Sequence, residues 1–150
     1  MRVSRRRGQL RLRLLPPEAA ALGQLFDELD ALIADPQPED PVVQRLYPAA
    51  YRDDEAAERE YRELTETSLR EEQSERLAAC RADLASGSDI GLDADAGTRW
   101  IQTLNDLRLA IGTRLGVTED DVPAGEHESR TIYYWLTHLQ DDIVQGLMGR

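Results

Sequence analysis

Residues 100–116, W-I-Q-T-L-N-D-L-R-L-A-I-G-T-R-L-G, constrain the fold more than any other segment of the chain. The apolar side chains of this segment recur at helical spacing, at Trp100, Leu104, Leu107 and Ile111. One face of a helix is therefore predicted to be buried in a core. Polar side chains lie between these positions, and a polar group beside a core costs about 1–3 kcal/mol if it has no hydrogen-bond partner. The segment thus predicts a core helix with either a satisfied polar network or a functional polar face.

We favour a structural network over a ligand-binding face. Asn105 and Arg108 lie on one helical line with Gly112, which leaves room for a long side chain or a second backbone. Arg108 is also expected to hold the neighbouring Asp106 carboxylate ionised, which suits a salt bridge better than acid–base catalysis. We expect Arg108 or Arg114 to reach a glutamate on a long preceding helix. The members of the predicted network are Asn105, Asp106, Arg108, Arg114, Glu60 and Glu66.

The remaining periodicities predict a mainly α fold. Residues 9–15 alternate apolar and polar side chains, as in a short half-buried strand with which residues 3–5 can pair as a hairpin. Helical patterns follow, bounded by proline, glycine or capping residues, and cover 17–34, one turn after Asp40-Pro41, 53–85, 93–116 and 129–146. We expect a helical bundle of about four main helices with a short N-terminal strand or β-hairpin. The whole is expected to be a single domain, 1–150, with a basic arm (1–15) and a helical bundle (16–150).

The pattern of the 53–85 segment is that of a solvated helix. Acid-before-base pairs at i and i+4, such as Glu55/Arg59, each contribute about 0.2–0.5 kcal/mol to helix formation. No residue between Arg70 and Arg76 is apolar, so the helix is expected to be either fully solvated or broken there. We favour the solvated helix over a surface for a partner.

Charge is unevenly distributed along the chain. Its 18 basic residues are all arginine, against 29 acids, for a formal net charge of −11. Residues 1–15 hold six arginines and no acid, which leaves 12 arginines and 29 acids, a formal −17, in the remainder. Such a body repels polyanions, so general nucleic-acid affinity is not expected. Only the arm is a candidate for phosphate contacts, although outward arginines on a strand are more often solvated, whereas the acidic body suits docking on a basic surface of a protein partner. The candidate residues of the arm for contact with DNA or a partner are Arg5, Arg6, Arg7, Arg11 and Arg13.

The sequence holds no constellation typical of catalysis. Its two histidines, His127 and His138, have no ligand spacing to an acid or a cysteine, and there is no Gly-rich phosphate loop or nucleophile elbow. We therefore expect a non-enzymatic protein without a metal or a cofactor. Alternating charges, not an apolar stretch, follow the arginine run at 5–7, so no signal peptide or membrane span is expected and the protein is expected to be cytoplasmic.

Cys80 is the only cysteine in the sequence, so an intrachain disulfide is impossible. It falls in helical register with Leu77 and Leu84. This register predicts a buried structural thiol rather than a reactive one.

Short motifs over nearly the whole chain carry a family resemblance. The most specific are N-D-L-R-L at 105–109 and G-T-R-L-G at 112–116. The others lie at 40–46, 48, 51–54, 60–62, 65–66, 69–70, 100, 134–136 and 139–140. With these motifs the chain resembles the AosR-like family of actinobacterial oxidative-stress transcriptional regulators, long described as a domain of unknown function. The resemblance implies a protein that senses oxidants and influences transcription, with a sigma factor as a partner.

Redox sensing in that family is linked to cysteines, and the chain departs from this pattern. A single cysteine, Cys80, can only be oxidised alone or cross-link two chains. Two functions therefore stay open at the level of the sequence. One is a transcription regulator that contacts DNA through the arginine arm; the other is an interaction module that acts through a sigma factor or polymerase, including an adaptor with no DNA binding or redox sensing. A homodimer is compatible with both, but the sequence does not locate its apolar face.

Overall fold

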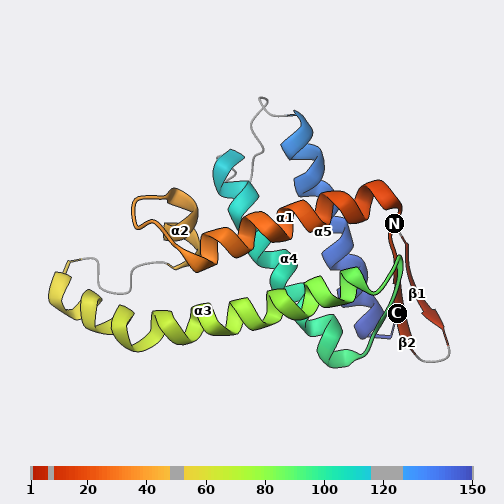
Figure 1. Cartoon of the computed structure of the whole chain (residues 1–150), viewed down its shortest axis with the longest axis horizontal. Coiled ribbons are helices and arrows are strands. Elements are labelled where there is room, and N and C mark those ends of the chain that lie inside the picture. Colours follow the sequence, from red (N-terminus) through yellow and green to blue (C-terminus); the bar gives the residue numbers. More distant parts are fainter. Residues whose placement is uncertain (1, 7–8, 48–52, 116–126, 150) are drawn as a thin grey trace.

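The computed structural model describes residues 2–6, 9–47, 53–115 and 127–149, and within them the chain forms five helices and three strands (Figure 1). Their order is β1 (Arg2–Arg6), β2 (Gln9–Arg13), α1 (Pro16–Ala34), α2 (Pro41–Leu46), α3 (Glu55–Ala85), β3 (Asp89–Leu92), α4 (Ala94–Leu115) and α5 (His127–Leu147). The predicted mainly α fold with an N-terminal β-hairpin is confirmed. The predicted helices are also present, with ends displaced by only a few residues.

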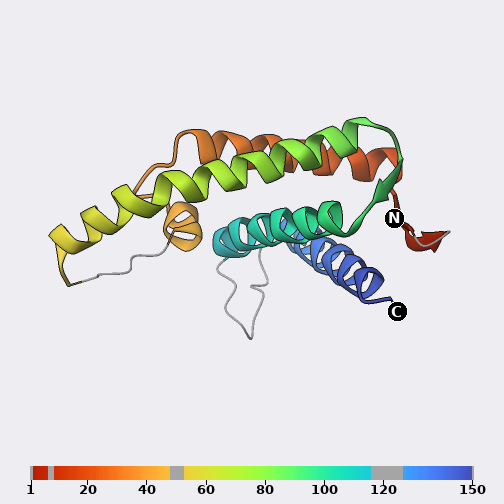
Figure 2. The same ribbon diagram turned by 90° about the horizontal axis from the view of Figure 1, so that it is seen from below.

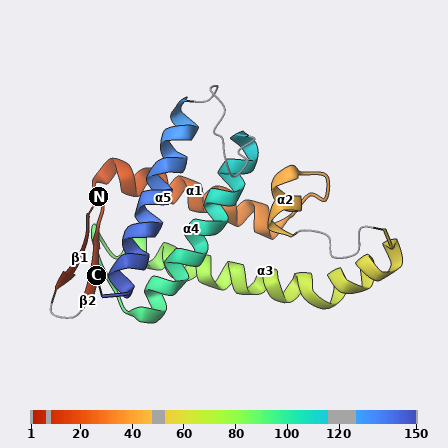
Figure 3. The ribbon, with the colours of Figure 1, turned by 180° about the vertical axis from the view of Figure 1, so that it is seen from behind.

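The helices lie in two layers. Helices α1 and α3 pack side by side in one layer, and α4 and α5 form the other, with α2 beside α4 (Figure 2). Helix α4 contacts each of the other four helices and β3. The sheet lies at one end of the layers, and the N-terminal part of α3 extends beyond the other helices at the opposite end (Figures 1 and 3). The segment that the sequence marked as a core helix is therefore the centre of the fold.

The buried face of α4 is the one that its periodicity predicts. Trp100 and Leu104 are completely buried, and Leu107 is buried. The Trp100 ring packs edge-on against Phe26 of α1, with 5.7 Å between the ring centroids. Its indole N–H donates a hydrogen bond to Asp83 Oδ2 of α3 at 2.9 Å, so the polar edge of this core residue is satisfied. One aromatic residue thereby joins α4 to both helices of the opposite layer.

Side-chain caps explain where three of the helices begin. The Asp40 carboxylate accepts a hydrogen bond from the Val42 N–H at 2.9 Å, which confirms the short capped turn predicted after Asp40. The Asp54 side chain accepts from the Ala57 N–H at the start of α3. The same arrangement begins α4, where the Asp93 carboxylate accepts from the third residue of the helix, Ala96, at 2.7 Å. These capping bonds satisfy N–H groups that have no partner inside the helix.

The sheet contains a strand that the sequence analysis missed. The sequence analysis assigned no element to the segment Asp89–Leu92, but it forms β3 and pairs antiparallel with β2. The strand order is β1-β2-β3, with Leu12 opposite Val3 on one side and Ile90 on the other. Strand β3 has four residues, too few to show an alternation of their own. Two-stranded ribbons are marginal in water, so the third strand stabilises the predicted hairpin.

The expectation of a fully solvated or broken helix at 70–76 is wrong. Helix α3 is continuous there, and Gln73 is buried. The hydroxyl of Tyr47, which follows α2, donates a hydrogen bond to Gln73 Oε1. The Arg70 guanidinium donates to the backbone carbonyls of Ile33 and Ala34 at the end of α1, at 3.0 and 3.1 Å. The segment lacks apolar residues because its contacts with α1 and with the residue after α2 are polar.

Candidate functional site

The outward face of the sheet gathers the basic residues of the arm. Alternation along β2 directs Leu10 and Leu12 into the core and Arg11 and Arg13 to the opposite face. The register places Arg2 of β1 directly beside Arg13 and places Asp89 of β3 on the other side of Arg13. Ser4 lies beside Arg11 in the same way. We call this surface, Arg2, Ser4, Arg11, Arg13 and Asp89, the basic sheet face.

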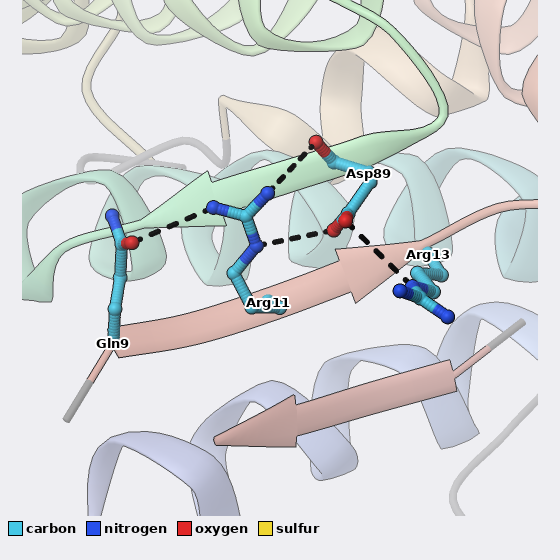
Figure 4. A network of polar contacts seen from close by, with 4 residues as sticks. All are labelled: Gln9, Arg11, Arg13 and Asp89. Carbon is cyan, nitrogen blue, oxygen red and sulfur yellow. Dashed lines mark hydrogen bonds and ion pairs between the residues drawn. The ribbon is translucent and has the colours of Figure 1, made fainter. Parts of the chain in front are cut away.

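A single carboxylate holds two of the arginines in place (Figure 4). Arg11 Nε donates to Asp89 Oδ1 at 3.1 Å, and Arg13 Nε lies 3.7 Å from Asp89 Oδ2. The same Arg11 guanidinium donates to Gln9 Oε1 and to the backbone carbonyl of Asp89, both at 3.5 Å. Gly91 permits this arrangement, because a Cβ there would lie 2.9 Å from Arg11 Nη1. Arg11 thus lies flat across β3, while Arg13 remains exposed.

Two hollows flank β1, one on each face of the sheet. The outward hollow has a volume of about 340 Å³ and is lined by the residues of the basic sheet face together with Arg5. The second hollow, of about 330 Å³, lies between β1 and the end of α5, where Asp142, Gln145 and Gly146 contribute to its wall. Both hollows are open to solvent, and polar side chains form most of their walls.

The structure divides the arginines that the sequence grouped as one arm. Arg11 and Arg13 are brought together on the basic sheet face. Arg5 is used differently, since its Nε donates to the Gly146 carbonyl of α5 at 2.9 Å and so ties the hairpin to the bundle. The side chain of Arg6 and all of Arg7 lie outside the described residues. Sequence reasoning did not select the partners of this face, Arg2 and Asp89. Asp89 carries no local signal, because it reaches the face only through the unexpected strand.

The predicted polar network exists in part, with different partners. The expectation that Arg108 reaches Glu60 or Glu66 on the long helix is not met. Its Nε donates to Thr137 Oγ1 of α5 at 3.0 Å, another of its N–H groups donates to Gln140 Oε1, and its guanidinium lies 5.6 Å from the centre of the Tyr133 ring. Arg108 thus joins α4 to α5.

The contact from this part of α4 to the long helix is made by Asp106. Its Oδ2 lies 3.6 Å from Arg76 Nη2, and both side chains are largely buried. Burial raises the pKa of the Asp106 carboxyl from 3.8 to about 6, although the adjacent Arg76 acts in the opposite direction. The cation that favours the ionised carboxylate is Arg76, so the expectation that Arg108 does so is wrong. Side chains two residues apart on a helix point about 200° apart, so Asp106 and Arg108 face different neighbouring helices.

The other members of the predicted network lie away from these contacts. Asn105 and Glu60 are exposed, and Glu66 is half-buried near Tyr47. The side chain of Arg114 lies outside the described residues. Burial raises the pKa of the Tyr47 phenol to about 12, so the phenol stays neutral. Its hydroxyl donates the hydrogen bond to Gln73 Oε1. These buried contacts between helices are structural, whereas the basic sheet face is open to solvent.

Comparison with known proteins decides the family. The model of the family described as "Domain of unknown function (DUF2017)" matches residues 1–147. The chain belongs to the DUF2017 family. The match covers both the sheet and the helical layers, so the basic sheet face lies within the family's domain.

The curated relatives of this DUF2017 chain are mycobacterial. It is 34% identical to the "Putative oxidative stress regulator AosR" of Mycobacterium leprae over an alignment of 132 residues, which covers 75% of this chain and 61% of that protein. The "Oxidative stress regulator AosR" of Mycobacterium tuberculosis is 30% identical with the same coverage. The resemblance to the AosR-like family is thereby confirmed. The chain spans about three fifths of the length of these relatives. No solved structure matches it.

The single thiol of this DUF2017 chain is enclosed by the core. Cys80 is completely buried and donates a hydrogen bond to Thr103 Oγ1 of α4 at 3.5 Å. Burial raises the pKa of the thiol to about 11. Oxidants react with an accessible thiolate, and both the burial and the raised pKa oppose this reaction. The predicted structural role of Cys80 agrees with its surroundings.

Two other kinds of site are absent from the described part of this DUF2017 chain. No group of three or more histidine, cysteine or acidic side chains there has an arrangement suited to a metal ion. No helix there is long and apolar enough to cross a membrane. Of the two histidines, His138 is exposed on α5, and the side chain of His127 lies outside the described residues.

Proposed function

We propose that this protein is a non-enzymatic regulator of transcription in the oxidative-stress response and acts by binding a protein of the transcription machinery, a sigma factor or the polymerase. The observation that carries this proposal is the 30–34% identity to proteins named oxidative stress regulators. The geometry supports it through the basic sheet face, an open and concave surface on an acidic protein.

DNA contact is the weaker part of the proposal. Of the arginines in the arm, Arg5 is bonded to α5, and Arg11 and Arg13 share the carboxylate of Asp89. The remainder of the chain carries a formal −17, which repels a phosphate backbone at long range. A protein partner is therefore favoured over direct binding to DNA.

An adaptor without DNA binding or redox sensing of its own is the second candidate function. The burial of Cys80 favours it, because the only thiol of the chain lies in the core. In this form the oxidant is sensed by the partner, and the DUF2017 domain links the partner to its target. A variant that lacks Cys80 but keeps its fold allows a regulator that senses oxidants through its thiol to be distinguished from an adaptor that does not.

A deletion strain tests the proposed function. The gene is removed from an organism that carries it, and transcripts are compared before and after peroxide. We expect altered peroxide-responsive transcripts, restored by a wild-type copy. Restoration by Cys80→Ala supports the adaptor, and its failure, with the variant shown to be folded, supports sensing by the thiol. Unchanged transcripts in the deletion strain would overturn the proposal.

A second experiment tests the partner directly. The purified protein is mixed with core polymerase, with individual sigma factors and with labelled promoter DNA at rising salt concentration. A complex with one of the proteins that persists without DNA is expected. Binding to DNA alone, lost when Arg5, Arg6 and Arg7 are replaced by alanine, would replace the protein partner by direct DNA contact.

A further inference from the structure

The basic sheet face contains an arrangement that the stability of the fold does not require. Arg2 and Arg13 lie directly opposite each other on neighbouring strands, and like charges in this position destabilise a sheet. Asp89 is the one carboxylate on this face among the described residues, and it already contacts both Arg11 and Arg13. The face thus holds three guanidinium groups, those of Arg2, Arg11 and Arg13, and one carboxylate, which contacts only the last two. The face carries an excess of positive charge that an anionic group from outside the sheet would balance.

The position of β1 indicates which kind of molecule would carry this anionic group. Strand β1 lies at the edge of the sheet. Among the described strands none pairs with its outer side, and the end of α5 lies next to it (Figure 3). An edge strand presents backbone N–H and C=O groups that can pair with another strand. The two hollows flank this edge, one above the basic sheet face and one between β1 and α5, so the alternate side chains of an added strand would each find a concave surface.

We propose that the free edge of β1 binds an extended acidic segment of a protein partner, which adds to the sheet as a fourth strand and places alternate acidic side chains on the outward face, one of them beside Arg2 and within reach of the long Arg13 side chain on the next strand. The proposal rests on the proposed function, for which it names the docking surface and the chemistry of the partner. Backbone pairing with β1 would supply affinity. The spacing of alternate acidic residues, about 7 Å along a strand, would supply specificity for the outward face.

Two other occupants fit the same surface less well. A nucleic acid would meet few guanidinium groups on this face, and the Asp89 carboxylate lies among them. Affinity for nucleic acid depends on the number of phosphates that such groups neutralise. A second copy of the chain pairing through β1 would place its own arginines against those of the first copy, because β1 reads R-V-S-R-R. An acidic protein segment carries charge opposite to that of the basic sheet face. An extended segment of five residues also matches the length of β1 and β2.

The probe is the fluorescein-labelled peptide Glu-Val-Glu-Val-Glu with blocked ends, titrated with the full chain and followed by fluorescence anisotropy. The peptide Gln-Val-Gln-Val-Gln tests the charges, and a Glu-Val peptide with alternate amides N-methylated tests the strand pairing. We expect both changes to weaken binding by about tenfold or more, the effect of losing two partly exposed ion pairs or the backbone bonds. Equal binding of the three peptides would overturn the proposal, as would tighter binding of a labelled DNA duplex.

Variants of the protein provide the complementary test. Arg2→Gln combined with Arg13→Gln is expected to weaken binding of the Glu-Val peptide by about tenfold. The control combines Arg45→Gln with Arg59→Gln, two exposed arginines of α2 and α3 that remove the same charge away from the sheet. The control should bind as the wild-type protein does. Equal weakening in both variants would assign the effect to overall charge and overturn the site.

The outcomes separate this inference from the proposed function. If the peptide does not bind while the deletion strain still shows altered transcripts, the docking surface is wrong and the regulatory function stands. If the peptide binds as expected and the deletion changes no transcript, the surface stands and the function is wrong. Thermal unfolding of each variant verifies its fold, and the modified peptides test the surface on the wild-type protein.

Discussion

Replacing Asp106 with asparagine should make the protein progressively more stable than the wild type as the pH rises from about 4 to about 6. Burial raises the pKa of this carboxyl from 3.8 to about 6 in the folded state, so the folded protein holds the proton more tightly than the unfolded chain does. Below pH 4 the carboxyl is protonated in both states. Between the two pKa values only the unfolded chain loses the proton, and this stabilises unfolding.

The magnitude follows from the shift. Each pKa unit corresponds to about 1.36 kcal/mol, so a rise from 3.8 to about 6 corresponds to about 3 kcal/mol of stability lost by pH 7. The Asp106 side chain is only 14% exposed, which limits screening by solvent. The asparagine of the variant does not titrate and does not incur this loss. At low pH the protonated carboxyl and the asparagine are both neutral beside Arg76, and the attraction of Arg76 for the ionised carboxylate is already contained in the pKa of about 6.

The assay is urea unfolding at a series of pH values from about 4 to 8, with the free energy of unfolding of the variant minus that of the wild type as the readout. Contributions shared by the two proteins cancel in this difference. The difference should rise through the acidic range and become flat above about pH 7. Asn105→Gln, a change at the exposed neighbouring residue, gives the control curve, which should stay flat. A difference that falls with rising pH would show that attraction by Arg76 outweighs burial, and would refute the reasoning.

Three further predictions concern the core and the sheet. Tyr47→Phe should lower the free energy of unfolding by about 1–3 kcal/mol, because the buried Gln73 loses its hydrogen bond, and urea unfolding measures this. The Cys80 thiol should react with a thiol-specific chromogenic disulfide only in denaturant; rapid reaction of the native protein would contradict its burial. Gly146→Ala should destabilise the protein by about 1–3 kcal/mol in thermal unfolding, because the added Cβ would overlap Leu10 of β2, and an unchanged melting temperature would show that the hairpin yields.

Local patterns determined much of the fold before any tertiary contact was known. The spacing of Trp100, Leu104 and Leu107 gave the buried face of α4, and Asp40-Pro41 gave the start of α2. The alternation of residues 9–13 gave β2 and its buried face. These features depend on periodicity, capping and backbone preference, which act between residues close in the chain.

Long-range contacts decided the rest. Strand β3 forms because β2, far earlier in the chain, pairs with it, and only this pairing brings Asp89 to the arginines. The buried Gln73 looked solvated because its partner, Tyr47, follows a different helix. Sequence reasoning likewise assigned Asp106 and Arg108 to one contact, whereas helical geometry sends them to α3 and α5.

The sequence by itself determined the helices, their buried faces, the basic composition of the arm and the family. The tertiary structure alone decided that Arg5 is tied to α5, that Arg2 lies beside Arg13, and that Arg11 and Arg13 share the carboxylate of Asp89. The physical reason is the distance along the chain over which each kind of interaction acts. Periodicity fixes the direction of a side chain relative to its own element, whereas the charge of a surface depends on which side chains from distant segments the packing brings within a few ångströms of each other.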